Sequence, residues 1–560
     1  MTDAQDGYIY KAIANALEGN NPVGLVLGED YPDHPVPKEG SNENHRRPYA
    51  VLDFFRVTDL WKENIMTGNN LVKVWRVRFE KINLDERSWW APISASENAQ
   101  TNVQPPTRQC GICSQVSKEI FTAGWMCLNH TCTNHFTMTR DMAVAVNDLT
   151  YTKEFLDQRT RVQCEIPEEW TRLQTHLSAD DENHGTEKAA HGGFHCVFCG
   201  CCSRRIYWNK LICENPKCKV EEPADMKVLP ERILAAELAG FNERMLKKNS
   251  TVNAGMPQPH WDPLACALNW SFPISSHTFT AGNYAGVRQY FLPKPGGGIA
   301  GSFTLIPSND VVNRAENGPD ALFRQLESKD IKLKRNPAAV RGNKMEGLTR
   351  HYQRNFGANY KFGVQVDSEG FAEAPPPVLF SVHRLDWVKS VSISQARGWA
   401  LSNRQTYDGI SEPVGDFNEL LALGFMEDDS INFHDDGESE LGPAVAALSL
   451  GSPSVMSFRP KYGKGRDGQF AAYGLPASTA AKKKYPSVLE VPFRHGDMMV
   501  MHGKEIQQFY EHAVVPQGMR RFSMTCRTIE LSTLSEDERA DALVKGAMPA
   551  DCSMYVYRGE

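Results

Sequence analysis

The feature that most constrains the fold of this 560-residue chain is a cysteine spacing that occurs twice. The spacing C-x2-C-x13-C-x4-C recurs with a constant offset of 86 residues. Four thiolates carried on two turns are typical of a tetrahedral structural zinc site. The sequence therefore predicts two zinc ions in a zinc-ribbon-like module over residues 106–225. The ligands are expected to be Cys110, Cys113, Cys127 and Cys132 for one ion, and Cys196, Cys199, Cys213 and Cys218 for the other.

The positions around the cysteines repeat too, since Asn129 corresponds to Asn215. The two sets could form separate ribbons or pack as one unit. The alternative to zinc binding is that the cysteines are free and buried. Other residues lie close enough to replace a ligand, namely His130, His135, His195, Cys201 and Cys202. Such closed sites hold a fold together and do no chemistry. Their short loops would contact a partner, either protein or nucleic acid.

Length and composition indicate a globular protein of two to four domains. Hydrophobic residues make up 41% and charged residues 23% of the chain. The net charge of −7 argues against a uniformly basic nucleic-acid-binding surface, so any such contact must use local patches. We expect a soluble, intracellular protein, because no apolar run approaches the length of a membrane span. In an unsecreted chain, fourteen cysteines favour metal sites over disulfides.

A second constellation lies between residues 431 and 529. His434 and Asp436 follow an apolar strand, and residues i and i+2 of an extended chain point to the same side. With His512 they would give the two-histidine, one-carboxylate ligand set of non-haem Fe(II) oxygenases. Arg521 and Arg527, six residues apart on a later strand, would face one side and could bind a dicarboxylate.

At these residues the chain resembles the AlkB family of Fe(II)/2-oxoglutarate-dependent nucleic-acid dealkylases. The matching elements occur in order: H-x-D, GPAVAALSLGS, HGDMMVM, HAVVP and R-x-S-x-T-x-R. The resemblance implies that His434, Asp436 and His512 bind iron and that Arg521, Arg527 and Ser523 bind 2-oxoglutarate. It also implies that Glu438 contacts the target base, and that Trp399 and Tyr407 belong to a nucleotide-recognition lid.

The same resemblance implies a mainly β, α+β fold: a double-stranded β-helix, or jelly roll, with helices on one side. The implied activity is demethylation of N-methylated bases such as N-methyladenine in DNA or RNA, with release of formaldehyde and succinate. The partners would be nucleic acid and, through the zinc module, chromatin proteins, which would place the protein in the nucleus. No membrane partner is expected.

The chain departs from the family at several positions. Ser523 stands where the family often has Asn, and Leu423-Gly424-Phe425 stands where it often has Asn-x-Tyr. Some co-substrate hydrogen bonds must then come from elsewhere. His502, just upstream, is a rival to His512 as third ligand.

Two further functions fit the sequence. A protein or histone hydroxylase or demethylase would keep the iron site but need a peptide groove. A zinc-anchored chromatin or nucleic-acid reader would have an inactive core, which the intact ligands and arginines argue against.

The expected domains are a β-rich module (1–105), the zinc module (106–225), a helical connector (226–275), the dioxygenase domain (276–530) and a tail (531–560). Helices are expected over 231–248 and 319–330, and strands over 287–293, 301–307 and 380–394. Residues 461–487 should form a basic loop between two core strands. This loop and a positive cluster in 332–355 could bind phosphates, or could be solvated surface.

Overall fold

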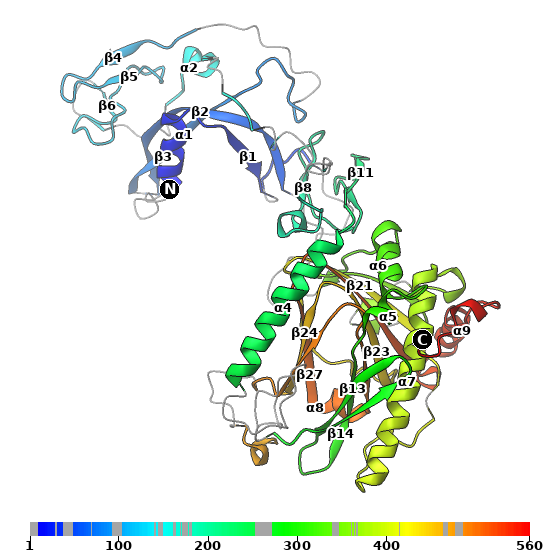
Figure 1. Cartoon of the computed structure of the whole chain (residues 1–560). Coiled ribbons are helices and arrows are strands. Elements are labelled where there is room, and N and C mark those ends of the chain that lie inside the picture. The colour runs from blue at the N-terminus through cyan, green and yellow to red at the C-terminus, as the bar shows by residue number, and fades with distance from the viewer. Residues whose placement is uncertain are drawn as a thin grey trace. The chain divides into compact units, whose positions relative to one another are not determined.

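The computed structural model describes most of the chain. The described residues are 9–28, 31–36, 49–68, 70–91, 103–138, 142–143, 149–160, 164–167, 170, 177, 182–252, 272–338, 347–359, 361–362, 364–365, 368–413, 415–462, 469–475 and 485–560. The chain divides into two compact units (Figure 1). The first comprises Met1–Gln174, Gly193–Arg204 and Ile212–Glu221; the second comprises Thr175–Gly192, Arg205–Leu211 and Glu222–Glu560. The five domains expected from the sequence remain predictions.

The first unit is built on a three-stranded antiparallel sheet in the order β1-β2-β3. Both cysteine sets pack against its long central strand. The imidazole of His135 hydrogen-bonds the carbonyl of Lys62 (3.1 Å), and Val51 donates to the carbonyl of Gly200 (2.7 Å). The elements are α1 (Ile9–Glu18), β1 (Val23–Leu27), β2 (Ala50–Thr67), β3 (Asn70–Lys81), β4 (Thr107–Gln109), β5 (Val116–Lys118), β6 (Thr137–Met138), β7 (Met142–Ala143), α2 (Lys153–Asp157), β8 (Phe194–His195) and β9 (Cys202–Ser203).

The second unit is a sandwich of a nine-stranded and a four-stranded sheet. The large sheet has the order β12-β13-β14-β26-β23-β28-β21-β17-β20, and the small one β22-β27-β24-β25. The large sheet contains β12 (Ser275–Ala281), β13 (Tyr284–Pro293), β14 (Ile299–Ile306), β17 (Tyr352–Gly357), β20 (Ser368–Glu369), β21 (Glu419–Met426), β23 (Leu441–Gly451), β26 (Met498–His502) and β28 (Arg520–Ile529). The small sheet contains β22 (Ile431–His434), β24 (Ser454–Pro460), β25 (Leu489–Phe493) and β27 (Tyr510–Pro516). This confirms the predicted jelly roll.

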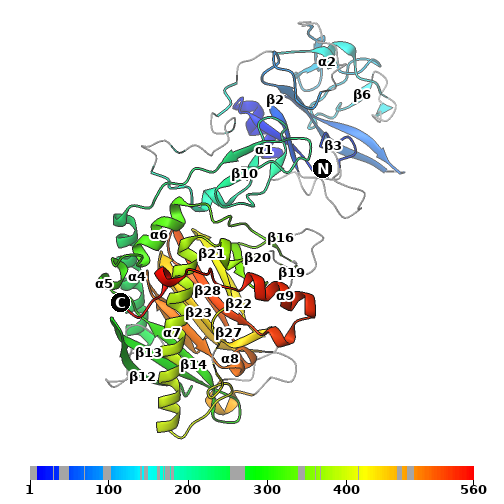
Figure 2. The ribbon, with the colours of Figure 1, turned by 90° about the vertical axis from the view of Figure 1, so that its right-hand side faces the viewer.

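Helices cover the outer face of the large sheet, as Figure 2 shows for α7 beside β23 and β28. The helices of this unit are α4 (Glu231–Val252), α5 (Asp310–Asn313), α6 (Pro319–Ser328), α7 (Pro376–Ser402), α8 (Lys504–Phe509) and α9 (Glu536–Lys545). Short strand pairs are β10 (Lys210–Ile212) with β11 (Glu221–Pro223), β15 (Pro337–Ala338) with β16 (Gly347–Leu348), and β18 (Lys361–Phe362) with β19 (Val364–Gln365). None of the helices described is long and apolar enough to cross a membrane.

Helix α7 corrects one expectation, because residues 380–394 are helical and not a strand. The segment contains several Val, Ile, Phe and Trp residues, which favour strands, and this composition hides its helical period. The buried positions Leu379, Val382, Leu385 and Val388 follow one another at three-residue steps, as on one face of a helix. Prolines occupy the first helical turn, where their missing N–H costs nothing.

Candidate metal centre and cavity

His434, Asp436 and His512 lie together at one end of the sandwich. Strand β22 pairs with β27 so that His434 faces His512 across the ladder, and the two rings are 4.3 Å apart between centroids. One donor atom from each of the three side chains lies within 4.8 Å of the other two. Two imidazoles and one carboxylate on one side of a site are the donor set that non-haem Fe(II) prefers. The three residues fit such an ion.

The protonation states also suit a divalent cation. Burial and, to a smaller extent, the neighbouring His434 together lower the pKa of His512 to about 3, so the His512 ring is neutral and can donate a lone pair. Burial alone would raise the pKa of Asp436, but Arg527 and the two histidines outweigh it and hold this pKa well below its ordinary value. Asp436 is therefore an ionised carboxylate with only 6% of its surface exposed.

The rival ligand His502 lies elsewhere. It sits on β26 in the large sheet, 1% exposed, with its Nδ1 2.9 Å from the hydroxyl of Tyr407. It does not belong to the group formed by the other three side chains. The structure thus brings His512, and not His502, to the H-x-D pair.

The metal-ligand group opens into a cavity of about 280 Å³ between the two sheets. Strand alternation decides which side chains reach it. On β28, Phe522, Met524 and Cys526 face the helices, whereas the alternate residues face the cavity. These cavity-facing residues are Arg521, Ser523, Thr525 and Arg527. Apolar side chains from both sheets form most of the remaining wall.

The two arginines differ in their partners. Arg527 donates to Asp436 at 2.8 Å and lies 3.5 Å from the buried Glu419. Arg521 is 5% exposed, and its Nε donates to the hydroxyl of Ser449 at 3.2 Å. Among the described residues no acid pairs with Arg521 and nothing accepts from its terminal nitrogens. Burial lowers the pKa of Arg521 to about 9. A buried cation with unused donors fits an external carboxylate.

Residues 321–532 match the family model described as the 2OG-Fe(II) oxygenase superfamily. This segment is therefore similar to the 2OG-Fe(II) oxygenases, and it is called the oxygenase domain below. The chain is 28% identical over 138 residues to "Alpha-ketoglutarate-dependent dioxygenase alkB homolog 3" of Rattus norvegicus. The aligned region covers 23% of this chain and 40% of that protein. A solved structure titled "The structure of OsALKBH1" is similar over 40% of this chain and 96% of that chain, with 13% identity and a TM-score of 0.26.

The chain thus spans about two fifths of the length of its curated relative. The matched range contains all three candidate ligands and both arginines. The comparison confirms the AlkB-like resemblance that the sequence motifs indicated.

Strand β17 of the oxygenase domain supplies polar residues that the sequence did not single out. Gln353 and Asn355 line the cavity, and they pair across the ladder with Leu423 and Leu421. The Oδ1 of Asn355 is buried without a hydrogen bond inside the described part of the chain. These amides stand beside the apolar residues found where the family often has Asn and Tyr. The alternation of polar residues in HYQRNFG was the signal that could have identified them.

The residues expected in a lid lie away from the oxygenase cavity. Trp399 stacks on Phe291 with a centroid distance of 3.6 Å, and Tyr407 is 4% exposed and bonds to Ser302 and His502. Neither residue lines the cavity, and nor does Glu438, which is half-buried. Trp399 and Tyr407 instead pack in a small apolar cluster between α7 and β13. These positions do not support the lid assignment.

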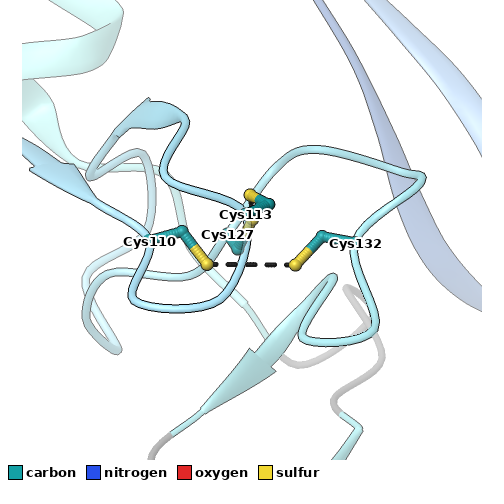
Figure 3. A group of neighbouring side chains, drawn as sticks. All are labelled: Cys110, Cys113, Cys127 and Cys132. Atoms are coloured by element: carbon teal, nitrogen blue, oxygen red, sulfur yellow. Dashed lines mark hydrogen bonds between the residues drawn. The ribbon is translucent and has the colours of Figure 1, made fainter.

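Outside the oxygenase domain, the cysteines gather in the two sets that their spacing predicts. In the first set, Cys110 and Cys132 point toward each other with sulfurs 3.9 Å apart, and the Cys113–Cys127 distance is 3.7 Å (Figure 3). In the second set the corresponding distances are 3.8 and 3.5 Å. Tetrahedral zinc, with Zn–S bonds of about 2.3 Å, requires sulfurs about 3.8 Å apart. Both sets fit zinc.

The repeated asparagines support the same conclusion. The backbone of Gln115 and the side chain of Asn129 lower the pKa of Cys113. Burial opposes ionisation of Cys199, but the side chain of Asn215 helps to hold its pKa below the ordinary value. Hydrogen bonds of this kind stabilise the thiolate that binds metal. The possible substitutes His130, His135, His195, Cys201 and Cys202 lie outside both groups.

Proposed function

We propose that the oxygenase domain is an Fe(II)/2-oxoglutarate-dependent dioxygenase that demethylates N-methylated bases, such as N-methyladenine, in DNA or RNA. The observation that carries the proposal is the meeting of three metal donors and one unpaired buried arginine in one cavity. Bound Fe(II) and 2-oxoglutarate would supply the oxidation of the N-methyl carbon, with formaldehyde and succinate as products. The curated relative is itself named a dioxygenase of the AlkB type.

His434, Asp436 and His512 would hold the iron. Arg527 would act on Asp436, because its guanidinium keeps that carboxylate ionised and fixes its orientation through the 2.8 Å bond. The apolar cavity wall would limit the access of water to the reacting atoms, which strengthens the electrostatic contacts inside. The protein thus contributes position and shelter, while the oxidation chemistry belongs to the bound groups.

Arg521 would hold a carboxylate of 2-oxoglutarate. Its planar fork can bind a carboxylate through two parallel hydrogen bonds. Ser523, two residues along the same face of β28, would add a hydroxyl donor. Gln353 and Asn355 would donate hydrogen bonds to 2-oxoglutarate. They would thus replace the Asn and Tyr that the family often has at the positions of Leu423 and Phe425, whose side chains cannot form hydrogen bonds.

The two cysteine sets are proposed to bind two structural zinc ions. They would shape the first unit and help it to engage substrate or chromatin. A nuclear location would follow from that role.

A turnover assay tests the proposal. Purified full-length protein with Fe(II), ascorbate and 2-oxoglutarate is given methylated DNA and RNA oligonucleotides and methylated histone peptides, and product mass and formaldehyde are measured. We expect demethylation of an oligonucleotide, its loss in His512→Ala, and its retention in His502→Ala. Peptide turnover alone would replace this function with a protein hydroxylase or demethylase. An active His512→Ala with an inactive His502→Ala would overturn the ligand assignment.

A further inference from the structure

A polar groove of about 940 Å³ lies next to the metal cavity within the second unit. The groove and the cavity adjoin at three places along the chain, where one residue lines the groove and its neighbour in sequence lines the cavity. These neighbouring pairs are Arg350 and His351, Ser430 and Ile431, and Val515 and Val514. A chain molecule with one group in the cavity would therefore continue into the groove.

One wall of the groove comes from outside the matched oxygenase segment. Residues 182–192, which lie in sequence between the two cysteine sets, pack on the turn that joins β21 to β22. The backbone N–H of Lys188 donates to Glu427 at 2.7 Å, and Glu427 donates its own N–H to the carbonyl of Thr186 at 2.9 Å. Arg335 donates to the carbonyl of His191 at 3.2 Å. This segment is thus built into the second unit.

The acidic and basic side chains of the groove differ in whether they have partners. Its three acids are already engaged: Glu427 by the backbone of Lys188, Asp428 by the Lys188 side chain at 2.8 Å, and Asp429 by the backbone of Met426 at 2.9 Å. Arg350, by contrast, is exposed and has neither an ion pair nor a hydrogen bond among the residues that the structure describes. Arg350, whose charge acts on Asp429 only at longer range, therefore lies at the boundary with the cavity.

Uncharged hydrogen-bonding groups accompany this arginine. Ser430 and Gln517 line the groove, and their side chains make no hydrogen bond within the described ranges. Arginine together with hydroxyl and amide groups is the usual set of contacts to the phosphates and sugars of a nucleic-acid strand. An arginine fork also matches the geometry of a phosphate.

We propose that this groove binds the sugar-phosphate backbone of the nucleotides next to the target base, with Arg350 as a phosphate contact and Lys188, on the segment 182–192, as a second cation of the lining. This rests on the proposed function and deepens it: the substrate is an oligonucleotide and not a free nucleoside. Because the three acids of the groove balance the charge of its three basic side chains, Lys188, Arg335 and Arg350, the groove contacts one or two phosphates and not a long tract. The segment 182–192 becomes a substrate-binding element that the oxygenase match does not include.

The test compares Arg350→Glu with Arg314→Glu in the full chain. Arg314 is a matched control, since its side chain is 75% exposed and does not line the groove. The probe for binding is a fluorescently labelled, unmethylated single-stranded oligonucleotide, followed by anisotropy at several salt concentrations. Arg350→Glu should weaken binding at least about tenfold at low salt, because attraction becomes repulsion. Its salt slope should fall by about 0.7 for the lost phosphate contact.

Turnover gives a second readout. Arg350→Glu should lower kcat/KM for a methylated oligonucleotide and leave that for the corresponding methylated nucleoside unchanged, with an unaltered Tm. Lys188→Gln should have the same sign and a smaller effect. Equal oligonucleotide binding by Arg350→Glu and wild type would overturn the groove proposal, and so would an equal loss of binding in Arg314→Glu. The proposal would also be overturned if Arg350→Glu weakened the binding of an acidic peptide and not that of the oligonucleotide.

The two proposals fail in different ways. If wild type demethylates no nucleic acid yet Arg350→Glu binds the oligonucleotide less tightly, the proposed reaction fails and the groove stands as a nucleic-acid site. If wild type demethylates a nucleoside and an oligonucleotide equally well and Arg350→Glu changes neither, the reaction stands and the groove proposal fails.

Discussion

Replacement of Arg521 by Met should stabilise the protein in the absence of co-substrate. The guanidinium is 5% exposed and lacks an acidic partner in the described structure, so the folded state bears the cost of a buried charge. Methionine has a similar length and fills the same space against the ring of Phe425, 5.2 Å away. The substitution therefore removes the cost and keeps most of the packing.

The size of the effect follows from the pKa. Burial lowers the pKa of Arg521 from 12.5 to about 9, which corresponds to about 5 kcal/mol of lost charge stabilisation. Because the folded-state pKa is the lower one, this cost is fully present below pH 9 and fades as the pH rises toward 12.5. Relaxation of the folded state around the buried charge reduces this cost, so we expect a gain of about 2 kcal/mol at pH 7. At roughly 2–4 °C per kcal/mol, Tm should rise by about 4–8 °C.

The neighbouring Arg520 is a control that points the other way. It is 1% exposed and both of its terminal nitrogens are engaged, with bonds to Glu327 at 2.6 Å and to the carbonyls of Lys227 and His184 at 2.8 and 2.9 Å. Arg520→Met would leave the buried Glu327 unpaired and should cost about 3–5 kcal/mol. Two adjacent arginines, both buried, are thus expected to respond with opposite signs.

The assay is thermal unfolding at pH 7 with and without 2-oxoglutarate and Mn²⁺, and direct calorimetry of 2-oxoglutarate binding. Wild type should be stabilised by about 2.7 kcal/mol at a co-substrate concentration of 100 Kd, and Arg521→Met should show no such gain. A lower Tm for unliganded Arg521→Met, or an undiminished stabilisation by 2-oxoglutarate, would refute the account of Arg521 as an unpaired carboxylate-binding cation.

Three further substitutions test other parts of the molecule. Cys199→Ser should lower the zinc content from two ions per chain to one, whereas Cys201→Ser, in the same loop but outside the group, should keep two; metal analysis of the purified variants decides. For His502, burial lowers the pKa to about 4, so stability is lost as the pH falls from 6.5, where the unfolded ring takes up its proton. His502→Gln should reduce the loss between pH 7 and pH 5 by about 2 kcal/mol in urea unfolding. Trp399→Ala should cost about 1–3 kcal/mol of stability and leave oligonucleotide turnover per folded molecule near wild type, since Trp399 packs on Phe291.

Each of these has a contrary outcome. Two zinc ions in Cys199→Ser would mean that another residue completes the second site. An unchanged pH dependence in His502→Gln would mean that its ring is protonated in the folded state. Normal melting with lost oligonucleotide turnover in Trp399→Ala would restore the lid assignment.

The sequence predicted those parts of the fold whose signals are local. The spacing of the cysteines determines both candidate zinc sets, because each ligand pair lies on one short turn. The helix over 319–330 and the strands over 287–293 and 301–307 correspond to α6, β13 and β14. Helix α7 was missed because its β-branched composition favours a strand, and packing against the large sheet overrides that preference.

The candidate site was predictable only in part, because its residues meet through strand register. His502 and His512 both lie on strands, and no local feature shows that β27, and not β26, pairs with β22. The family motif favoured His512, and the register supplies the physical reason. Gln353 and Asn355 enter the cavity through pairing of β17 with β21, some seventy residues away, which the sequence could not show.

The spacing of Arg521 and Arg527 predicts which side they face but not which groups they contact. Residues six apart on a strand must face the same side, and Arg521 and Arg527 do line one cavity. Spacing does not say what each will meet there. Arg527 lies between Asp436 and Glu419, so its charge acts on a carboxylate of the proposed metal site. Arg521 lies among Ser449 and apolar side chains, and no acid in the described part of the chain pairs with it. We therefore expect the anchoring of a dicarboxylate to depend mainly on Arg521, and Arg527 to act chiefly through Asp436.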